Sequence, residues 1–151
     1  MSLDAGRKMR IREKIVLRAV AKGFLPIILL FALYVQFHGD YGPGGGFQAG
    51  VIFAAGLILY ALVFSLEELR RAVPPIVVEI GIALGTLLYG GVGLVSMLSG
   101  GEFLDYGVLD HHDPKHGQHL GILLVELGVG LTVTFVMLAI FYSFAGRSEE
   151  R

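Results

Sequence analysis

The sequence has no cysteine and little charge, since Asp, Glu, Lys and Arg make up only 17% of its 151 residues. The absence of cysteine excludes disulfide bonds and thiolate metal sites. The scarcity of charge, with a hydrophobic fraction of 54% and a mean hydropathy of +0.70, places the chain outside the soluble globular class and inside the membrane class. The connections between its apolar stretches are too short to hold a soluble domain.

Four apolar stretches define the predicted architecture, at residues 15–37, 47–66, 76–99 and 120–144. Each can cross a hydrocarbon core of about 30 Å, which requires about 20 helical residues. Lipid offers no hydrogen-bond partner to an open strand edge, so the spans should be helical. We therefore predict an all-α integral membrane protein with four transmembrane helices. Residues 1–151 should form a single multi-pass domain, located in the cell membrane.

Seven of the twelve lysine and arginine residues precede or enter the first span, namely Arg7, Lys8, Arg10, Arg12, Lys14, Arg18 and Lys22. Basic residues concentrate on the cytoplasmic side of a membrane. With four spans, Arg70, Arg71 and the basic tail fall on the same side as this leader (residues 1–22), and only Lys115 falls on the other. The asymmetry predicts that both termini are cytoplasmic. A basic cluster beside a span is ordinary, which weighs against a leader that binds nucleic acid or anionic lipid.

The first connection is rich in glycine and contains the run Pro43, Gly44, Gly45, Gly46, Phe47. Glycine permits positive φ and close backbone approach, and Pro43 disfavours helical geometry at the residue before it. We therefore predict a glycine-rich break between the first two helices, with Phe47 restarting the second. A backbone nest for an anion is the alternative, but the lysine, hydroxyl residue and preceding strand of a phosphate-binding loop are missing.

Small residues form stripes on the predicted helices, where they let another backbone approach closely. On the second helix the stripe comprises Gly50, Ala54, Ala61 and Ser65. On the third helix Gly81 and Gly85 form one patch, and a different side carries Glu79, Thr86, Gly90 and Gly93. On the fourth helix one face carries Gly121, Gly128 and Thr132, and the nearly opposite face carries Glu126 and Gly130.

Two such faces on one helix predict that the chain sits in a larger assembly, since four helices alone would leave many second faces against lipid. The helix-packing positions that we predict are Gly50, Gly81, Gly85, Gly121 and Gly128. The alternative explanation is that glycine is simply common in membrane helices.

Two carboxylates fall inside the predicted spans, Glu126 and Glu79. An acidic residue near the centre of a membrane helix costs about 2.5 to 3.5 kcal/mol on insertion scales, so it usually faces protein, water or a partner. Glu126 is a candidate for coordinating a cation or relaying a proton, and a structural hydrogen bond is the alternative. Glu79 lies about one turn inside its span, where its side chain can reach the headgroups, which favours a structural role.

The third connection contains four histidines, His111, His112, His116 and His119, among several aspartates. These side chains suit zinc or copper, but their spacing matches no established ligand pattern. A solvated outer loop is the favoured interpretation, so we predict no metal and no cofactor, with the four histidines as weak metal candidates only.

Two segments resemble a known family. The run from Pro26 to Tyr34, followed by the Pro43–Phe47 motif and Gly50, resembles the B subunit of the Mrp (also Mnh) multisubunit cation/proton antiporters. The sequence Leu-Val-Glu-Leu-Gly-Val around Glu126 is similar to the last helix of that family, where aspartate is more usual at the acidic position. The resemblance covers about residues 24–144, and the histidine-rich loop matches no family motif.

The resemblance implies a non-catalytic subunit of a sodium/proton antiporter complex, which supports or lines the cation path and whose proton-pathway subunits are other chains. The partners it implies are those membrane subunits, monovalent cations, protons and lipids, with no nucleic acid. Two alternatives stay open, because membrane-bound hydrogenase complexes carry a similar subunit and because two-faced helices also suit a self-sufficient homo-oligomeric channel or small transporter.

Overall fold

The computed structural model describes the backbone of residues 2–39, 42–110 and 112–149, and the side chains of residues 15–39, 42–110 and 112–146. Its elements are α1 (Ser2–His38), α2 (Gly46–Val63), α3 (Leu66–Ala72), α4 (Pro75–Leu98), the short 3₁₀-helix η1 (Tyr106–Leu109) and α5 (Pro114–Glu149). Over these ranges the chain contains helices and no strand.

Four helices are long and apolar enough to cross a membrane. The candidate spans are Ile15–His38, Gly46–Val63, Pro75–Leu98 and Pro114–Gly146. This confirms the prediction of an all-helical chain with four membrane-spanning helices. The basic leader and the first span form one continuous helix, since α1 extends from Ser2 through Pro26 to His38.

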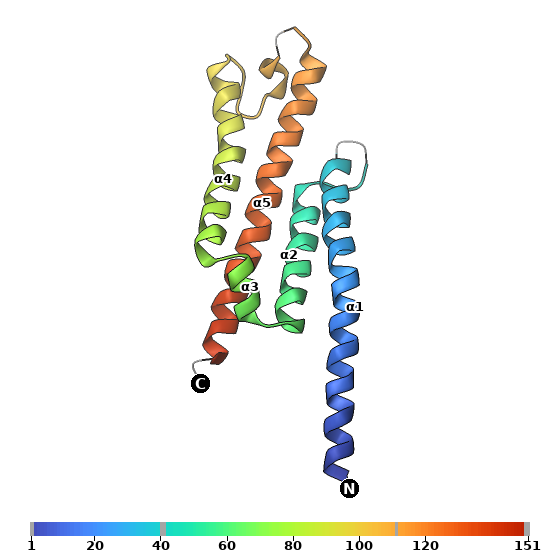
Figure 1. The fold of residues 1–151 in the computed structure, drawn as a ribbon. Helices are drawn as coiled ribbons and strands as arrows, with labels where there is room; N and C mark the ends of the chain where they lie inside the picture. The colour runs from blue at the N-terminus through green and yellow to red at the C-terminus, as the bar shows by residue number, and fades with distance from the viewer. Residues whose placement is uncertain (1, 40–41, 111, 150–151) are drawn as a thin grey trace.

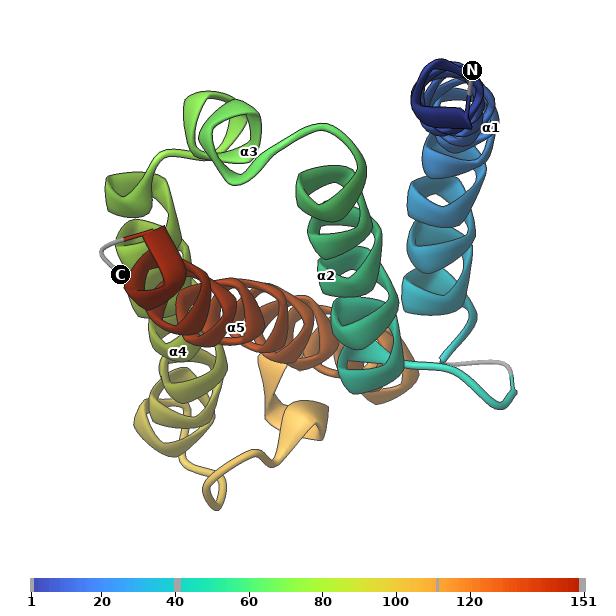
Figure 2. The same cartoon turned by 90° about the horizontal axis from the view of Figure 1, so that it is seen from below.

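The long helix α5 lies at the centre of the bundle. It packs against α4 on one side and α2 on the other, and α1 packs on the far side of α2 (Figures 1 and 2). Helix α1 begins and α5 ends at one end of the bundle, which we call the terminal end, and η1 lies at the opposite end, the η1 end (Figure 1). The connection between α1 and α2 contacts the side of α5 below the η1 end (Figure 1).

The largest buried side chains gather near the terminal end. Leu69 of α3 and Leu138 of α5 are both 0% exposed, and they cluster with Val78 and Tyr142. The Tyr142 hydroxyl donates a hydrogen bond to the carbonyl oxygen of Val73 at 2.8 Å. The short helix α3 is therefore fastened to α5 by an apolar contact and a hydrogen bond.

Helix α3 replaces part of the inner turn expected from the sequence. The second span ends at Val63, three residues earlier than predicted, and Ser65 caps the next helix instead of continuing the stripe of small residues. Its Oγ accepts a hydrogen bond from the backbone N–H of Glu68 at 3.1 Å. A serine cap followed by acidic residues in the first turn, as at Glu67 and Glu68, stabilises a helix start.

The fourth membrane helix also begins earlier than predicted, at Pro114 instead of residue 120. The Asp113 carboxylate accepts hydrogen bonds from the backbone N–H groups of Lys115 and His116, at 3.1 and 3.3 Å. An aspartate cap followed by proline in the first helical position is a favourable helix start, because proline has no N–H to leave unpaired there. The polar stretch that contains His116 and His119 is therefore helical.

Candidate ion-handling site at Glu126

Glu126 lies well inside the membrane-spanning part of α5. At 1.5 Å per residue, it is about 18 Å along the helix from Pro114. The first six residues of this helix form a polar stretch, and the sequence interpretation placed them in the connection before the helix. The side chain is partly buried and faces the α1–α2 connection.

Three glycines of that connection lie directly against Glu126. A Cβ atom built on Gly39 would lie 2.5 Å from one carboxylate oxygen of Glu126, and one built on Gly45 would lie 3.0 Å from it. A Cβ atom on Gly46 would collide with the backbone oxygen of Glu126. The missing side chains therefore allow the loop backbone to reach the carboxylate, and residues that the sequence suggested separately form one site.

The loop has a defined backbone. The N–H of Gly45 donates to the carbonyl of Val35 at 3.1 Å, and the N–H of Gly42 donates to that of His38 at 3.1 Å. Gly45 has φ +117°, a conformation that L side chains rarely adopt, and it is the residue from which α2 begins. Phe47, which the sequence suggested as the start of this helix, is the second residue of α2, and its side chain is exposed.

Gln36 is a site residue that the sequence interpretation missed. It is 6% exposed, on the face of α1 that packs inward, and its Oε1 atom lies against Gly130 on the turn of α5 that follows Glu126. An amide inside the first apolar span was the available signal, since buried polar groups are costly in a membrane. The sequence could not indicate that Gln36 and Glu126 face the same space.

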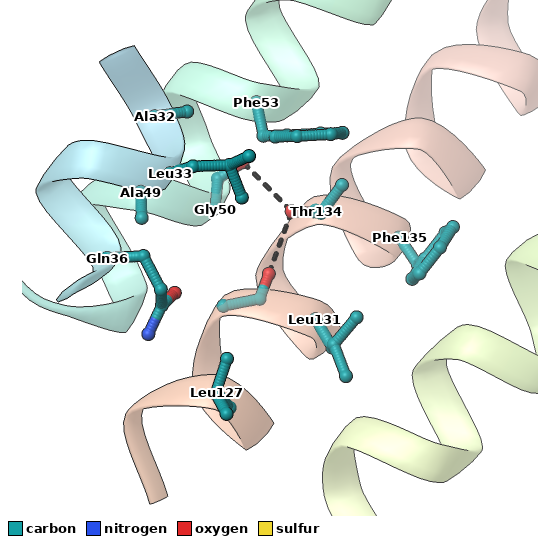
Figure 3. A pocket seen from close by; sticks show the side chains of 11 residues that line it. Ala32, Leu33, Gln36, Ala49, Gly50, Phe53, Leu127, Leu131, Thr134 and Phe135 are labelled. Atoms are coloured by element: carbon teal, nitrogen blue, oxygen red, sulfur yellow. Dashed lines mark hydrogen bonds between the residues drawn. The ribbon is translucent and has the colours of Figure 1, made fainter. Parts of the chain in front are cut away.

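Two cavities meet at Gln36. The outer cavity, of about 280 Å³, reaches the first turns of α5 and is lined by Gln36, Phe37, His116, His119, Leu120, Leu123 and Glu126. The inner cavity, also of about 280 Å³, lies between α1, α2 and α5 and is lined mainly by apolar side chains (Figure 3). Its only other polar side chain, Thr134, donates to the carbonyl oxygens of Gly130 and Gly50, at 2.8 and 3.3 Å (Figure 3).

Of the histidines predicted as weak metal candidates, His116 and His119 line the outer cavity. The Nδ1 atom of His116 lies 3.0 Å from a carboxylate oxygen of Asp110. Hydrogen bonds hold the pKa of Asp110 below its ordinary value. The largest effect comes from the backbone N–H of Asp113, followed by the backbone N–H of His112 and the His116 ring. His111 lies outside the described residues, and among those described no three His, Asp or Glu side chains are grouped closely enough to hold a metal ion.

Glu79 does not join Glu126. It is exposed on α4, near the terminal end, whereas the part of α4 that faces the neighbourhood of Glu126 is around Tyr89. The antiparallel packing of α4 and α5 separates the two carboxylates by about ten residues of helix, or about 15 Å.

The predicted packing glycines lie at helix contacts. A Cβ atom on Gly81 would meet the Phe135 ring, one on Gly85 would meet Gly128 and Thr132, and one on Gly121 would meet Tyr106. Gly50 lies against Val133 and the carbonyl of Gly130. These contacts give α5 two covered faces, one toward α4 and η1 and one toward α1 and α2.

The second face of α5 is therefore covered by this chain itself, and not by lipid as expected from the sequence. On α4 the situation differs, because Glu79 and Thr86 are exposed and no atom lies within 4 Å of a Cβ built on Gly90. Gly93 of the same stripe is buried against Phe103 of the following loop.

The chain is similar to known antiporter subunits. A family described as a domain related to the MnhB subunit of Na⁺/H⁺ antiporters matches residues 16–139. Proteins of Staphylococcus aureus strains Newman, JH1 and Mu3, each provisionally named antiporter subunit mnhB2, are 36% identical to it over 134 residues, covering 87% of this chain and 94% of theirs. The matches confirm the resemblance suggested by the glycine motif and by the sequence around Glu126. The chain therefore belongs to the family of domains related to the MnhB subunit of Na⁺/H⁺ antiporters.

Proposed function

We propose that this chain is a non-catalytic membrane subunit of a multisubunit Na⁺/H⁺ antiporter complex in the cell membrane, and that Glu126 handles a transported ion. Family membership supports the first part. The observation that carries the second part is the position of Glu126, inside a membrane-spanning helix, against a glycine loop and at the base of a cavity.

The chemistry of a carboxylate fits exchange. An ionised carboxylate accepts hydrogen bonds or coordinates a hard cation, and a protonated one has lost that charge. A single carboxylate that alternates between proton and sodium therefore couples the two, because each occupant excludes the other. The glycines that lie against Glu126 place backbone, and no side chain of their own, beside this carboxylate.

A substitution series at Glu126 tests this role. Glu126→Asp should retain part of the sodium/proton exchange, because it keeps a titratable group with a shorter reach. Glu126→Gln keeps the size and most of the hydrogen-bonding capacity but cannot ionise, so exchange should fall about tenfold or more while the complex still assembles. The measurement is sodium-dependent proton flux in everted vesicles over a range of pH.

A purely structural role gives the opposite pattern. The glutamine variant would then transport at the wild-type rate, and Glu126→Ala would lower the amount of assembled complex by leaving a partner group unsatisfied. Assembly is measured on native gels from the same membranes.

Purification of the tagged chain in mild detergent distinguishes the proposed complex from the two alternatives. We expect several other hydrophobic proteins to co-purify, without iron–sulfur clusters or nickel. A pure homo-oligomer would favour the self-sufficient channel, and iron–sulfur or nickel in the preparation would favour a hydrogenase-like complex. The stripe of α4 with Thr86 and Gly90 offers a second close-packing surface in either kind of assembly, so the co-purifying proteins are what distinguish them.

A further inference from the structure

Gln36 interrupts the apolar inner face of α1. The other buried residues of that face are Ala21, Leu25 and Ala32. The amide nitrogen of Gln36 is buried and has no hydrogen-bond partner among the described residues. An unpaired amide N–H in apolar surroundings is unfavourable, so a group outside the described protein atoms should accept this hydrogen bond.

The two cavities beside Gln36 differ in what they can hold. The outer cavity presents His116, His119, Glu126 and Gln36, and at about 280 Å³ it has room for several water molecules with more than one polar partner each. The inner cavity offers only Gln36 and Thr134, and the Thr134 hydroxyl already donates to a backbone carbonyl. Apolar cavities of this kind do not retain water.

The Gln36 side chain lies at the border between these two environments. Its nitrogen is drawn pointing away from Thr134, while its oxygen is turned toward α5 (Figure 3). An acceptor for the nitrogen is therefore expected on the side away from Thr134, and the outer cavity is the polar one that Gln36 lines.

We propose that the Gln36 amide binds a water molecule at the inner limit of a hydrated path, which runs from the η1 end past His116 and His119 to Glu126. In this arrangement the N–H of Gln36 donates to the water oxygen, and the hydrated path ends where the apolar inner cavity begins. Glu126 thus exchanges protons or cations with the η1 side only, and any transfer toward the terminal end passes through another chain. This inference deepens the proposed role of Glu126 and rests on it for its functional meaning.

Cysteine accessibility tests the path, because the chain has no native cysteine. Leu123 and Leu127 form a matched pair, one helical turn apart on α5, the first lining the outer cavity and the second the inner one. Only a hydrated thiol ionises and reacts readily. In the assembled complex, a charged, membrane-impermeant thiol reagent added from the η1 side should modify Leu123→Cys about tenfold faster or more than Leu127→Cys.

Gln36 should control this reactivity. Adding Gln36→Leu to the Leu123→Cys chain removes the water-binding amide at similar size, and modification should slow about fivefold. Gln36→Asn, which keeps an amide, should slow it less. The control is Gln118→Leu, an exposed glutamine of α5 that lines neither cavity, and it should leave the rate unchanged.

Other outcomes overturn the inference. Equal modification of both cysteines would mean that the inner cavity is hydrated, and no modification of either would mean that no water path reaches Glu126 from this side. An unchanged rate in the Gln36→Leu chain would remove the role of the amide. If that chain does not assemble, the Gln36→Asn variant and the Leu123/Leu127 comparison still decide the matter.

Cysteine labelling does not depend on ion transport. The labelling experiment can therefore contradict the hydrated path without contradicting the proposed function, and the flux measurement can do the reverse. The expected labelling with normal flux in Glu126→Gln would support a hydrated path whose carboxylate does not handle ions. Absent labelling with lost flux in Glu126→Gln would refute the path while leaving the role of Glu126 intact.

Discussion

Gly39, Gly45 and Gly46 differ from the other glycines of the chain because all three lie against Glu126 of α5. Most glycines in membrane helices permit helix packing, but these three lie against a single carboxylate-bearing residue. The loop therefore reaches the Glu126 carboxylate with its backbone. Any side chain at Gly46 must displace either the loop or α5, because the colliding atom is backbone.

We therefore expect Gly46→Ala to destabilise the purified complex. Overpacking against backbone costs about 1 to 3 kcal/mol, which should appear as a lower melting temperature and less assembled complex. The matched control is Gly23→Ala on α1, where a Cβ atom would meet nothing within 4 Å. Equal melting temperatures for the two alanine variants would mean that the loop and α5 are not in close contact.

The contact between Gly46 and Glu126 could be predicted from the sequence only in part. An acidic residue in an apolar span marks Glu126, and repeated glycine marks the loop, because each signal is local. Their contact depends on which face of α5 turns toward α1 and α2, and no local pattern specifies that rotation. Gln36 was not predicted as a site residue for the same reason, since it is identified as one by the two cavities that it lines.

Helix α3 shows how a short element can hold the terminal end of the bundle together. It has only seven residues, too few to be stable alone. Its stability comes from Leu69, which is completely buried against α5, and from the cap at Ser65. The hydrogen bond from Tyr142 to Val73 fixes the turn that leads into α4.

We expect Tyr142→Phe to loosen this end of the molecule. The substitution keeps the buried ring but leaves the carbonyl of Val73 without its donor, at a cost of about 1 kcal/mol. Backbone amides of α3 should then exchange hydrogen faster in mass spectrometry, while α2 is unaffected. Tyr60→Phe serves as control, since it removes a tyrosine hydroxyl from α2 and keeps the ring that packs against Phe64. Unchanged exchange in α3 would refute the anchoring role.

Two helix starts that the sequence interpretation misplaced were in fact encoded locally. Ser65 is followed three residues later by Glu68, and Asp113 is followed directly by Pro114, both of which are common helix-start patterns. The prediction from hydropathy placed Ser65 at the end of the second span, and residues 67–75 and 113–119 in connections. Hydropathy locates the part of a helix that can lie in lipid, whereas capping residues locate where the helix begins.

At the scale of the whole molecule, the central position of α5 changes how the assembly is expected to form. Other helices of the same chain already cover both packed faces of α5, so partner subunits would contact α1 and α4. The stripe with Glu79, Thr86 and Gly90 on α4 is the exposed surface that best fits a helix from another chain, because small and polar residues permit close approach and interhelical hydrogen bonds.

The distribution of basic residues predicts the orientation of the bundle in the membrane. Arg18 and Lys22 of α1 and Arg70 and Arg71 of α3 lie toward the terminal end, whereas Lys115 lies at the start of α5, toward the η1 end. Basic residues that are far apart in the sequence therefore lie toward the same end of the bundle. Because cytoplasmic ends retain basic residues, this distribution favours a cytoplasmic terminal end.

A pair of reporters tests this orientation. A reporter fused after Arg151 should be active only in the cytoplasm, and one inserted beside Lys115 should be active only outside, because the span of α5 separates the two sites along the chain. The energetic basis is about 1 kcal/mol of attraction to the anionic inner leaflet for each basic residue near the surface. Replacing Arg18 and Lys22 with glutamine should therefore increase the fraction of inverted chains, whereas replacing Lys115 should not. The reverse labelling of the two reporters in the unmodified chain would overturn the predicted topology.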